Sequence, residues 1–123
     1  MGDPTNDWDR RVRVYERLMD CMPDAAAALD LDGVFFFVNR RACELCGYSA
    51  EELIGSSFTR LLDAADLDSV AAQVFRTLRT GTPVKSFKTR IRRKDGDTRI
   101  ISFALDPLTE SGQILARLER RKT

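Results

Sequence analysis

Two cysteines three residues apart, Cys43 and Cys46, form the spacing in this chain that most suggests chemistry. A Cys-x-x-Cys pair can act as a redox couple or supply half of a metal site. A structural metal site needs about four ligands, and the remaining cysteine, Cys21, brings the chain to three thiols. The pattern favours small cysteines that face a core, with no metal bound; a redox role, or a cluster shared between two copies, is the alternative.

Histidine is absent from the chain. This absence excludes a Ser-His-Asp triad, a histidine general base and a His-ligated haem. The sequence also contains no phosphate-cradling glycine motif and no nucleophile with a plausible base beside it. We therefore predict that the chain is not an enzyme and has no catalytic residues.

Asn39 is the next candidate for a functional side chain. It follows the apolar run from Val34 to Val38 and precedes a short helical segment from Arg40 to Cys46. An asparagine in this position can cap the helix with its side-chain oxygen. The same side chain could instead reach a ligand, and capping is the favoured interpretation.

Two hairpins are expected to form the sheet that positions these residues. The first consists of strands 25–31 and 34–38 joined at Asp32-Gly33, a dipeptide typical of tight turns. The second has strands of alternating polarity on either side of Asp95-Gly96. A last short strand is expected over residues 113–118.

Helices are expected mainly between the two hairpins. Apolar residues recur at helical spacing over 66–80, and Gly81 follows directly. Ser49 and Glu52 form a capping box for a shorter helix. Apolar residues make up 43% of the 123 residues, enough for one domain with its own core. The predicted fold class is α+β, an antiparallel sheet with helices packed on one face.

The N-terminal segment carries a heptad-like seam. Its apolar residues recur at spacings of four, three, four and three, which predicts a helix. This helix packs either on its own domain or against a second copy, and a homodimer is the favoured interpretation. The interface candidates are Trp8, Val12, Tyr15, Met19 and Met22.

The inner face of the sheet is expected to be aromatic and aliphatic. Such faces usually pack closely, and an apolar ligand pocket is the alternative. Thr89 and Ser102 are its polar candidates, although the alternation places Ser102 on the opposite face from Phe103. The pocket candidates are Phe35, Phe37, Asn39, Leu45, Leu53, Phe58, Val74, Phe87, Thr89, Ile91, Ile101 and Phe103.

The net charge of +1 hides an uneven distribution. Residues 1–83 carry nine basic and fourteen acidic side chains, and residues 84–123 carry eleven basic and five acidic ones. The basic strands lack interleaved aromatics, so a solvated face or a dock for an acidic helix is favoured over nucleic-acid binding. An odd cysteine count, no secretory signal and no membrane-length apolar run predict a cytoplasmic location without membrane contact.

Five short motifs follow one another along the chain: Met22-Pro23-Asp24-Ala25, Leu29-Asp30-Leu31-Asp32-Gly33, Val38-Asn39-Arg40, the run from Gly47 to Gly55, and Arg93-Lys94-Asp95-Gly96. In order and spacing the chain resembles a PAS domain over residues 17–118. The resemblance implies a five-stranded antiparallel sheet cupped by helices. It also implies a sensory or dimerising module attached to a histidine kinase, a nucleotide cyclase or a transcription regulator.

The resemblance divides the chain into an N-terminal helix (1–22), the PAS domain (23–118) and a charged tail toward an effector (119–123). Such a module would sense a small ligand or a change of state; a ligand-free interaction scaffold is the alternative. The family's Asp-x-Thr relay signature is missing from the last strand, 114–122. Flavin photosensors of the family carry a cysteine directly after the asparagine, whereas Arg40 follows Asn39 here. A flavin photo-adduct is therefore not expected.

Overall fold

The structure is a computed structural model that describes residues 13, 17–18, 20–108 and 113–120. Its elements are β1 (Ala25–Leu29), β2 (Phe35–Val38), α2 (Arg40–Cys46), α3 (Ala50–Leu53), the 3₁₀ turn η1 (Phe58–Leu61), α4 (Ala64–Thr80), β3 (Val84–Arg92), β4 (Thr98–Pro107) and β5 (Ile114–Arg120). Of the seam predicted for dimerisation, Met22 is described and is half-buried. Trp8, Val12, Tyr15 and Met19 lie outside the described residues.

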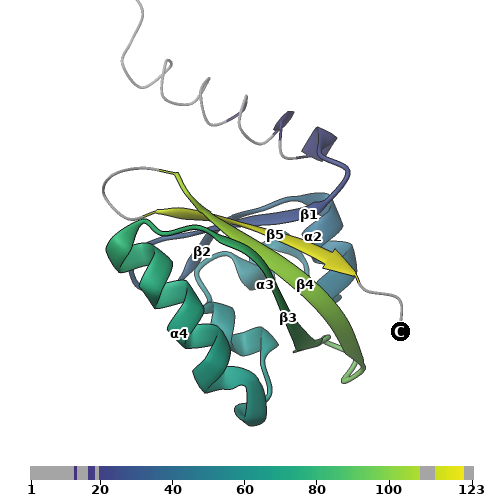
Figure 1. Ribbon diagram of the computed structural model, residues 1–123. Helices are drawn as coiled ribbons and strands as arrows, with labels where there is room; N and C mark the ends of the chain where they lie inside the picture. The colour runs from purple at the N-terminus through teal and green to yellow at the C-terminus, as the bar shows by residue number, and fades with distance from the viewer. Residues whose placement is uncertain (1–12, 14–16, 19, 109–112, 121–123) are drawn as a thin grey trace, which may run out of the picture.

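The five strands form one antiparallel sheet in the order β2-β1-β5-β4-β3 (Figure 1). The helices pack on one face of this sheet, and the predicted fold class is confirmed. The two hairpins do not pair directly with each other. The last strand, β5, lies between them and pairs with β1 on one side and with β4 on the other.

The helix ends follow the local signals in the sequence. Glu52 N donates to Ser49 Oγ at 3.2 Å and Ser49 N donates to Glu52 Oε1 at 3.1 Å, which is the predicted capping box of α3. Helix α4 begins two residues before the predicted start and ends at Thr80. Gly81 caps it, and its φ of 71° is the left-handed conformation that glycine adopts readily. The buried residues Val70, Val74 and Leu78 lie on one stripe of α4 and join the core cluster.

A β-bulge in the first hairpin changes which face each β2 residue occupies. Leu29 pairs with Phe35, but Ala28 pairs with Phe37, so Phe36 is the extra residue. The prediction that Phe35 and Phe37 share the inner face is therefore wrong. One inserted residue moves every later side chain to the other face, and Val38 takes the inner position instead of Phe37.

Candidate functional site

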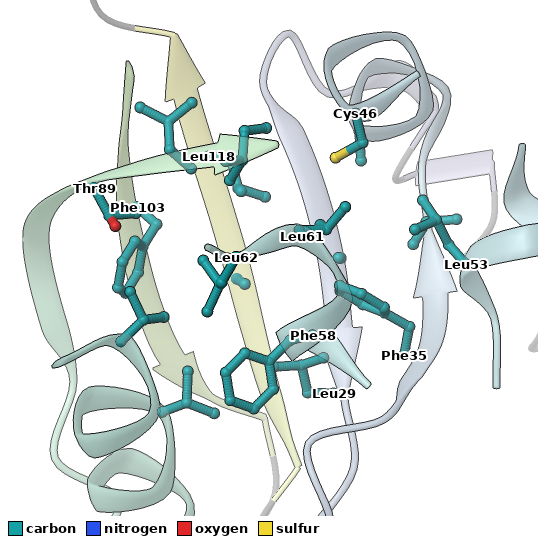
Figure 2. Close-up of a pocket in the computed structure, with 18 of the residues that line it drawn as sticks. Leu29, Phe35, Cys46, Leu53, Phe58, Leu61, Leu62, Thr89, Phe103 and Leu118 are labelled. Carbon is teal, nitrogen blue, oxygen red and sulfur yellow. The ribbon is translucent and has the colours of Figure 1, made fainter. Parts of the chain in front are cut away.

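An apolar cavity of about 60 Å³ lies between the sheet and the helices (Figure 2). Its walls come from every strand and from each of α2, α3, η1 and α4, so residues far apart in sequence meet there. None of the residues that line it is charged. They are Ala27, Leu29, Phe35, Val38, Ala42, Cys46, Leu53, Phe58, Leu61, Leu62, Val70, Val74, Thr89, Ile91, Ile101, Phe103, Leu105, Ala116 and Leu118.

The structure brings together most of the pocket candidates named from the sequence. Those that line the cavity are Phe35, Leu53, Phe58, Val74, Thr89, Ile91, Ile101 and Phe103. The other four candidates, Phe37, Asn39, Leu45 and Phe87, do not line it.

Asn39 is fully engaged with the backbone around it. Its Oδ1 accepts hydrogen bonds from Ala26 N and Ala42 N, each at 2.9 Å, and its Nδ2 donates to Asp24 O at 2.9 Å. The side chain therefore caps α2 and also ties that helix to the start of β1. Asn39 borders a separate hollow of about 360 Å³ on the outside, together with Phe37 and Cys43.

Leu45 and Phe87 are half-buried and pack against the core cluster without reaching the cavity. On α2 the inward positions are Ala42 and Cys46, four residues apart, so Leu45 lies to the side of them. Phe87 follows a register shift in β3, and its ring packs against that of Phe103 with centroids 5.2 Å apart.

Several lining residues were missed by the sequence reasoning. Leu105 continues the alternation of Ile101 and Phe103 along β4, so the period of two could have identified it. Ala27 lies two residues before Leu29 on β1 and therefore on the same face. All five residues of that strand are buried and four of them are alanine, so the sequence does not show which face is the inner one. For Leu62 and Ala116 the sequence offered no comparable signal.

The thiols of Cys43 and Cys46 both have raised pKa values. Burial raises the pKa of Cys46 to about 12, and the nearby Cys43 adds to this rise while Arg93 opposes it. Burial also raises the pKa of Cys43, with further contributions from Asp20 and Glu44. Both groups are protonated near neutral pH, and a protonated thiol is a poor nucleophile and metal ligand.

All three cysteines are free, and Cys21 is exposed. Within the described residues, no group of three or more histidine, cysteine, aspartate or glutamate side chains is placed to hold a metal ion. In that same part of the chain, no helix has the length and apolarity needed to cross a membrane.

The turn between β3 and β4 holds the end of α2. Arg93 Nη1 donates to the carbonyls of Glu44 and Leu45 at 3.2 and 3.3 Å, and Lys94 N donates to Cys46 O at 3.0 Å. Unpaired carbonyls at a helix C-terminus carry partial negative charge, so a guanidinium is favourable there. These contacts fix the position of α2, which supplies Ala42 and Cys46 to the cavity wall.

The same turn also holds α3. Lys94 Nζ forms an ion pair with Glu52 Oε2 at 2.7 Å. Glu52 belongs to the capping box of α3, and Leu53 beside it lines the cavity. One side of the cavity wall is thus fastened to the tip of the second hairpin.

The ion pair between Glu52 and Lys94 predicts a pH dependence of stability. The hydrogen bond from Lys94, and next that from Ser49 N, lower the pKa of Glu52 from 4.5 to about 2. Because the pKa is lower in the folded state, the stabilisation is complete above about pH 4.5 and is lost as the pH falls toward 2. We expect Glu52→Gln to lower the urea midpoint of unfolding at pH 7 and to have little effect at pH 2.

A matched control for this prediction is Glu51→Gln, a change at an exposed neighbour in the same helix. This variant should leave the urea midpoint nearly unchanged at both pH values. An effect of Glu52→Gln that is equally large at pH 7 and pH 2 would show that charge pairing with Lys94 is not the cause.

Basic side chains of β3 are partly neutralised by acidic residues at the start of α4. Arg90 pairs with Asp66 at 3.2 Å, and Arg92 pairs with Asp63. The guanidinium groups remain exposed at the sheet edge, where ion pairs contribute little to stability. These pairs connect the edge strand to the long helix.

Comparison with known families identifies the fold. A family model described as the PAS fold matches residues 13–119. The chain belongs to the PAS family. Among curated proteins, this PAS domain is similar to the C4-dicarboxylate transport sensor protein DctS of Rhodobacter capsulatus, with 36% identity over 88 residues. The match covers 69% of this chain and 13% of that protein, so the chain spans only a small part of its relative.

Solved structures of other PAS domains have the same architecture. The PAS domain of an HTR-like protein from Haloarcula marismortui is 25% identical with a TM-score of 0.67, and the match covers 95% of this chain and 97% of that one. A domain of a sensory box sensor histidine kinase/response regulator from Geobacter sulfurreducens is 21% identical with a TM-score of 0.73, covering 91% and 96%. This PAS domain is therefore a signal-transduction module related to domains of sensor proteins.

Proposed function

We propose that this PAS domain is the input module of a two-component signalling protein, in which a small molecule enters the apolar cavity and the change is passed to an attached effector. The observation that carries the proposal is the cavity itself, since it lies between the sheet and its helical cover in a chain of a sensory family. An apolar hollow with few polar groups is the usual form of a small-molecule site. The three free cysteines agree with a reducing cytoplasm.

The last strand offers a route from the cavity to the effector. Ala116 and Leu118 of β5 line the cavity, and β5 pairs with both β1 and β4. An occupant that changes the packing of these side chains acts on the central strand of the sheet. The proposed effector follows this strand through the charged residues 119–123.

A C4-dicarboxylate is a poor candidate for the occupant, although the name of the Rhodobacter relative includes it. The cavity walls contain no positively charged side chain. A carboxylate buried without a partner loses its hydration and gains no ion pair in return. The sensing activity that we propose therefore concerns a different class of molecule.

Native mass spectrometry of the chain purified from cells tests this proposal. We expect wild-type protein to retain a small molecule, or to gain one from a cell extract. Ala27→Val, which adds two methyl groups to the cavity wall, should abolish the added mass. As a control, Ala104→Val alters a half-buried β4 residue outside the cavity wall and should keep it. If wild type shows no added mass with any extract, the ligand-free scaffold becomes the better account.

We also propose that the module forms a homodimer through its N-terminal seam. The support is the heptad-like spacing of Trp8, Val12, Tyr15, Met19 and Met22. A glutamate in the seam buries a charge on association, so Val12→Glu is expected to halve the mass measured by light scattering. Arg13→Glu, at the next position along the helix, serves as the control. A dimer mass that persists in Val12→Glu would exclude the seam as the interface.

A further inference from the structure

We propose that the cavity selects a small, uncharged and mostly apolar molecule of about three or four heavy atoms that presents one hydrogen-bonding group to Thr89. This inference rests on the proposed function, because it names the class of ligand for the same cavity. Three features of the site lead to it: its volume, the chemistry of its walls and the position of one hydroxyl.

The volume limits the size of the occupant. The cavity measures about 60 Å³, whereas an engineered apolar cavity of about 150 Å³ accepts benzene or xenon. The space here therefore suits a xenon atom or a molecule the size of propanol. Cofactors as large as flavin or haem do not fit without movement of the walls.

The walls limit the charge and polarity of the occupant. Apart from the Thr89 hydroxyl and the Cys46 thiol, hydrocarbon groups surround the space. A buried water needs two to four polar partners, and these walls supply too few of them. A charged occupant would lose its hydration without compensation. An uncharged apolar molecule loses little on entering.

Thr89 supplies the polar anchor. The residue is only 8% exposed, and it lies in the middle of β3 opposite Ile101. Figure 2 shows its side chain beside the ring of Phe103 at one end of the cavity. Among the residues that line the cavity, Thr89 is the one with a hydroxyl group. An occupant with one hydrogen-bonding group would gain a hydrogen bond from this hydroxyl.

Methyl NMR with three probes of similar size tests the proposal. Xenon is apolar, 2-propanol adds one hydroxyl, and acetate adds a charge. We expect xenon and 2-propanol to shift the methyl signals of Val74 and Ile101, which line the cavity, and acetate to leave them unchanged. Equal shifts with acetate and 2-propanol would overturn the proposal.

The variant Thr89→Val separates the anchor from the shape of the cavity, because valine matches threonine in volume. We expect it to weaken 2-propanol binding about five- to tenfold, the effect of losing one hydrogen bond, and to leave xenon binding within about twofold. Thr98→Val makes the same change at an exposed position of β4 and should alter neither. Unchanged 2-propanol affinity in Thr89→Val would overturn the role of Thr89.

The outcomes also distinguish this proposal from the proposed function on which it rests. If native mass spectra reveal a charged or much larger occupant, the ligand class is wrong while the input-module proposal stands. Both proposals fail if neither the probes nor the cell extracts give a binding signal that is lost in Ala27→Val.

Discussion

Replacing Asn39 with alanine is expected to destabilise the domain by about 3–5 kcal/mol, enough to leave many domains of this size largely unfolded. Asn39 is 1% exposed, and it bonds to the backbone of Asp24, Ala26 and Ala42. Loss of a helix cap typically costs about 1 kcal/mol, and each buried backbone group left unpaired costs about 1–3 kcal/mol more.

The control for this prediction is Ser49→Ala, which removes the cap of α3 at an exposed position. We expect it to cost only about 1 kcal/mol, because water can replace the lost hydrogen bond there. Both values come from urea unfolding followed by circular dichroism. Equal losses in the two variants would show that Asn39 acts as a simple cap and does not hold β1 to α2.

Replacing Gly33 with alanine is the second change with a large expected effect. Gly33 has a φ of +76°, and a Cβ atom there would lie 2.7 Å from Cε1 of Phe58 and 2.8 Å from its Cδ1. Phe58 N also donates to Gly33 O at 3.0 Å, which keeps the backbone in place. The left-handed backbone costs about 1–2 kcal/mol for alanine, and displacement of a packed ring adds about 1–3 kcal/mol.

Gly81→Ala provides a matched control for Gly33→Ala. Gly81 has a similar φ of +71°, but no atom lies within 4 Å of the added Cβ. It should therefore show only the backbone cost of about 1–2 kcal/mol. Thermal unfolding of the two variants measures the difference. Similar losses of stability in Gly33→Ala and Gly81→Ala would mean that the Phe58 ring does not pack against Gly33. The result also bears on the cavity, because Phe58 lines it.

The parts of the fold that depend on local chemistry could be predicted from the sequence. Asp-Gly turns, the Ser49–Glu52 capping box and the apolar stripe of α4 act over a few residues, so spacing alone identifies them. The alternation along β4 likewise placed Ile101 and Phe103 on the cavity side and Ser102 on the other. On that other face, Ser102 Oγ lies 3.0 Å from Ser86 Oγ as a hydrogen-bonded pair.

The features that depend on long-range pairing could not be predicted in this way. The bulge at Phe36 arises from the pairing of β1 with β2, and it reversed the expected place of Phe37. The position of β5 between the hairpins depends on contacts across about 90 residues of chain, from Ala25 to Leu118. Whether the inner face closes completely or leaves a cavity depends on side-chain rotamers, which the spacing of apolar residues does not fix.

Amide hydrogen exchange of β5 most directly tests the central claim that an occupant of the cavity changes this strand, which we propose leads to an effector. The exchange rate of each amide would be measured in wild-type protein with and without 2-propanol. The same measurements would be made on Ala27→Val, in which the added methyl groups are expected to fill the cavity. We expect slower exchange from Ile114 to Leu118 when 2-propanol is bound to wild type, and no such change in Ala27→Val. If exchange along β5 stays the same while 2-propanol occupies the cavity, the claim is contradicted.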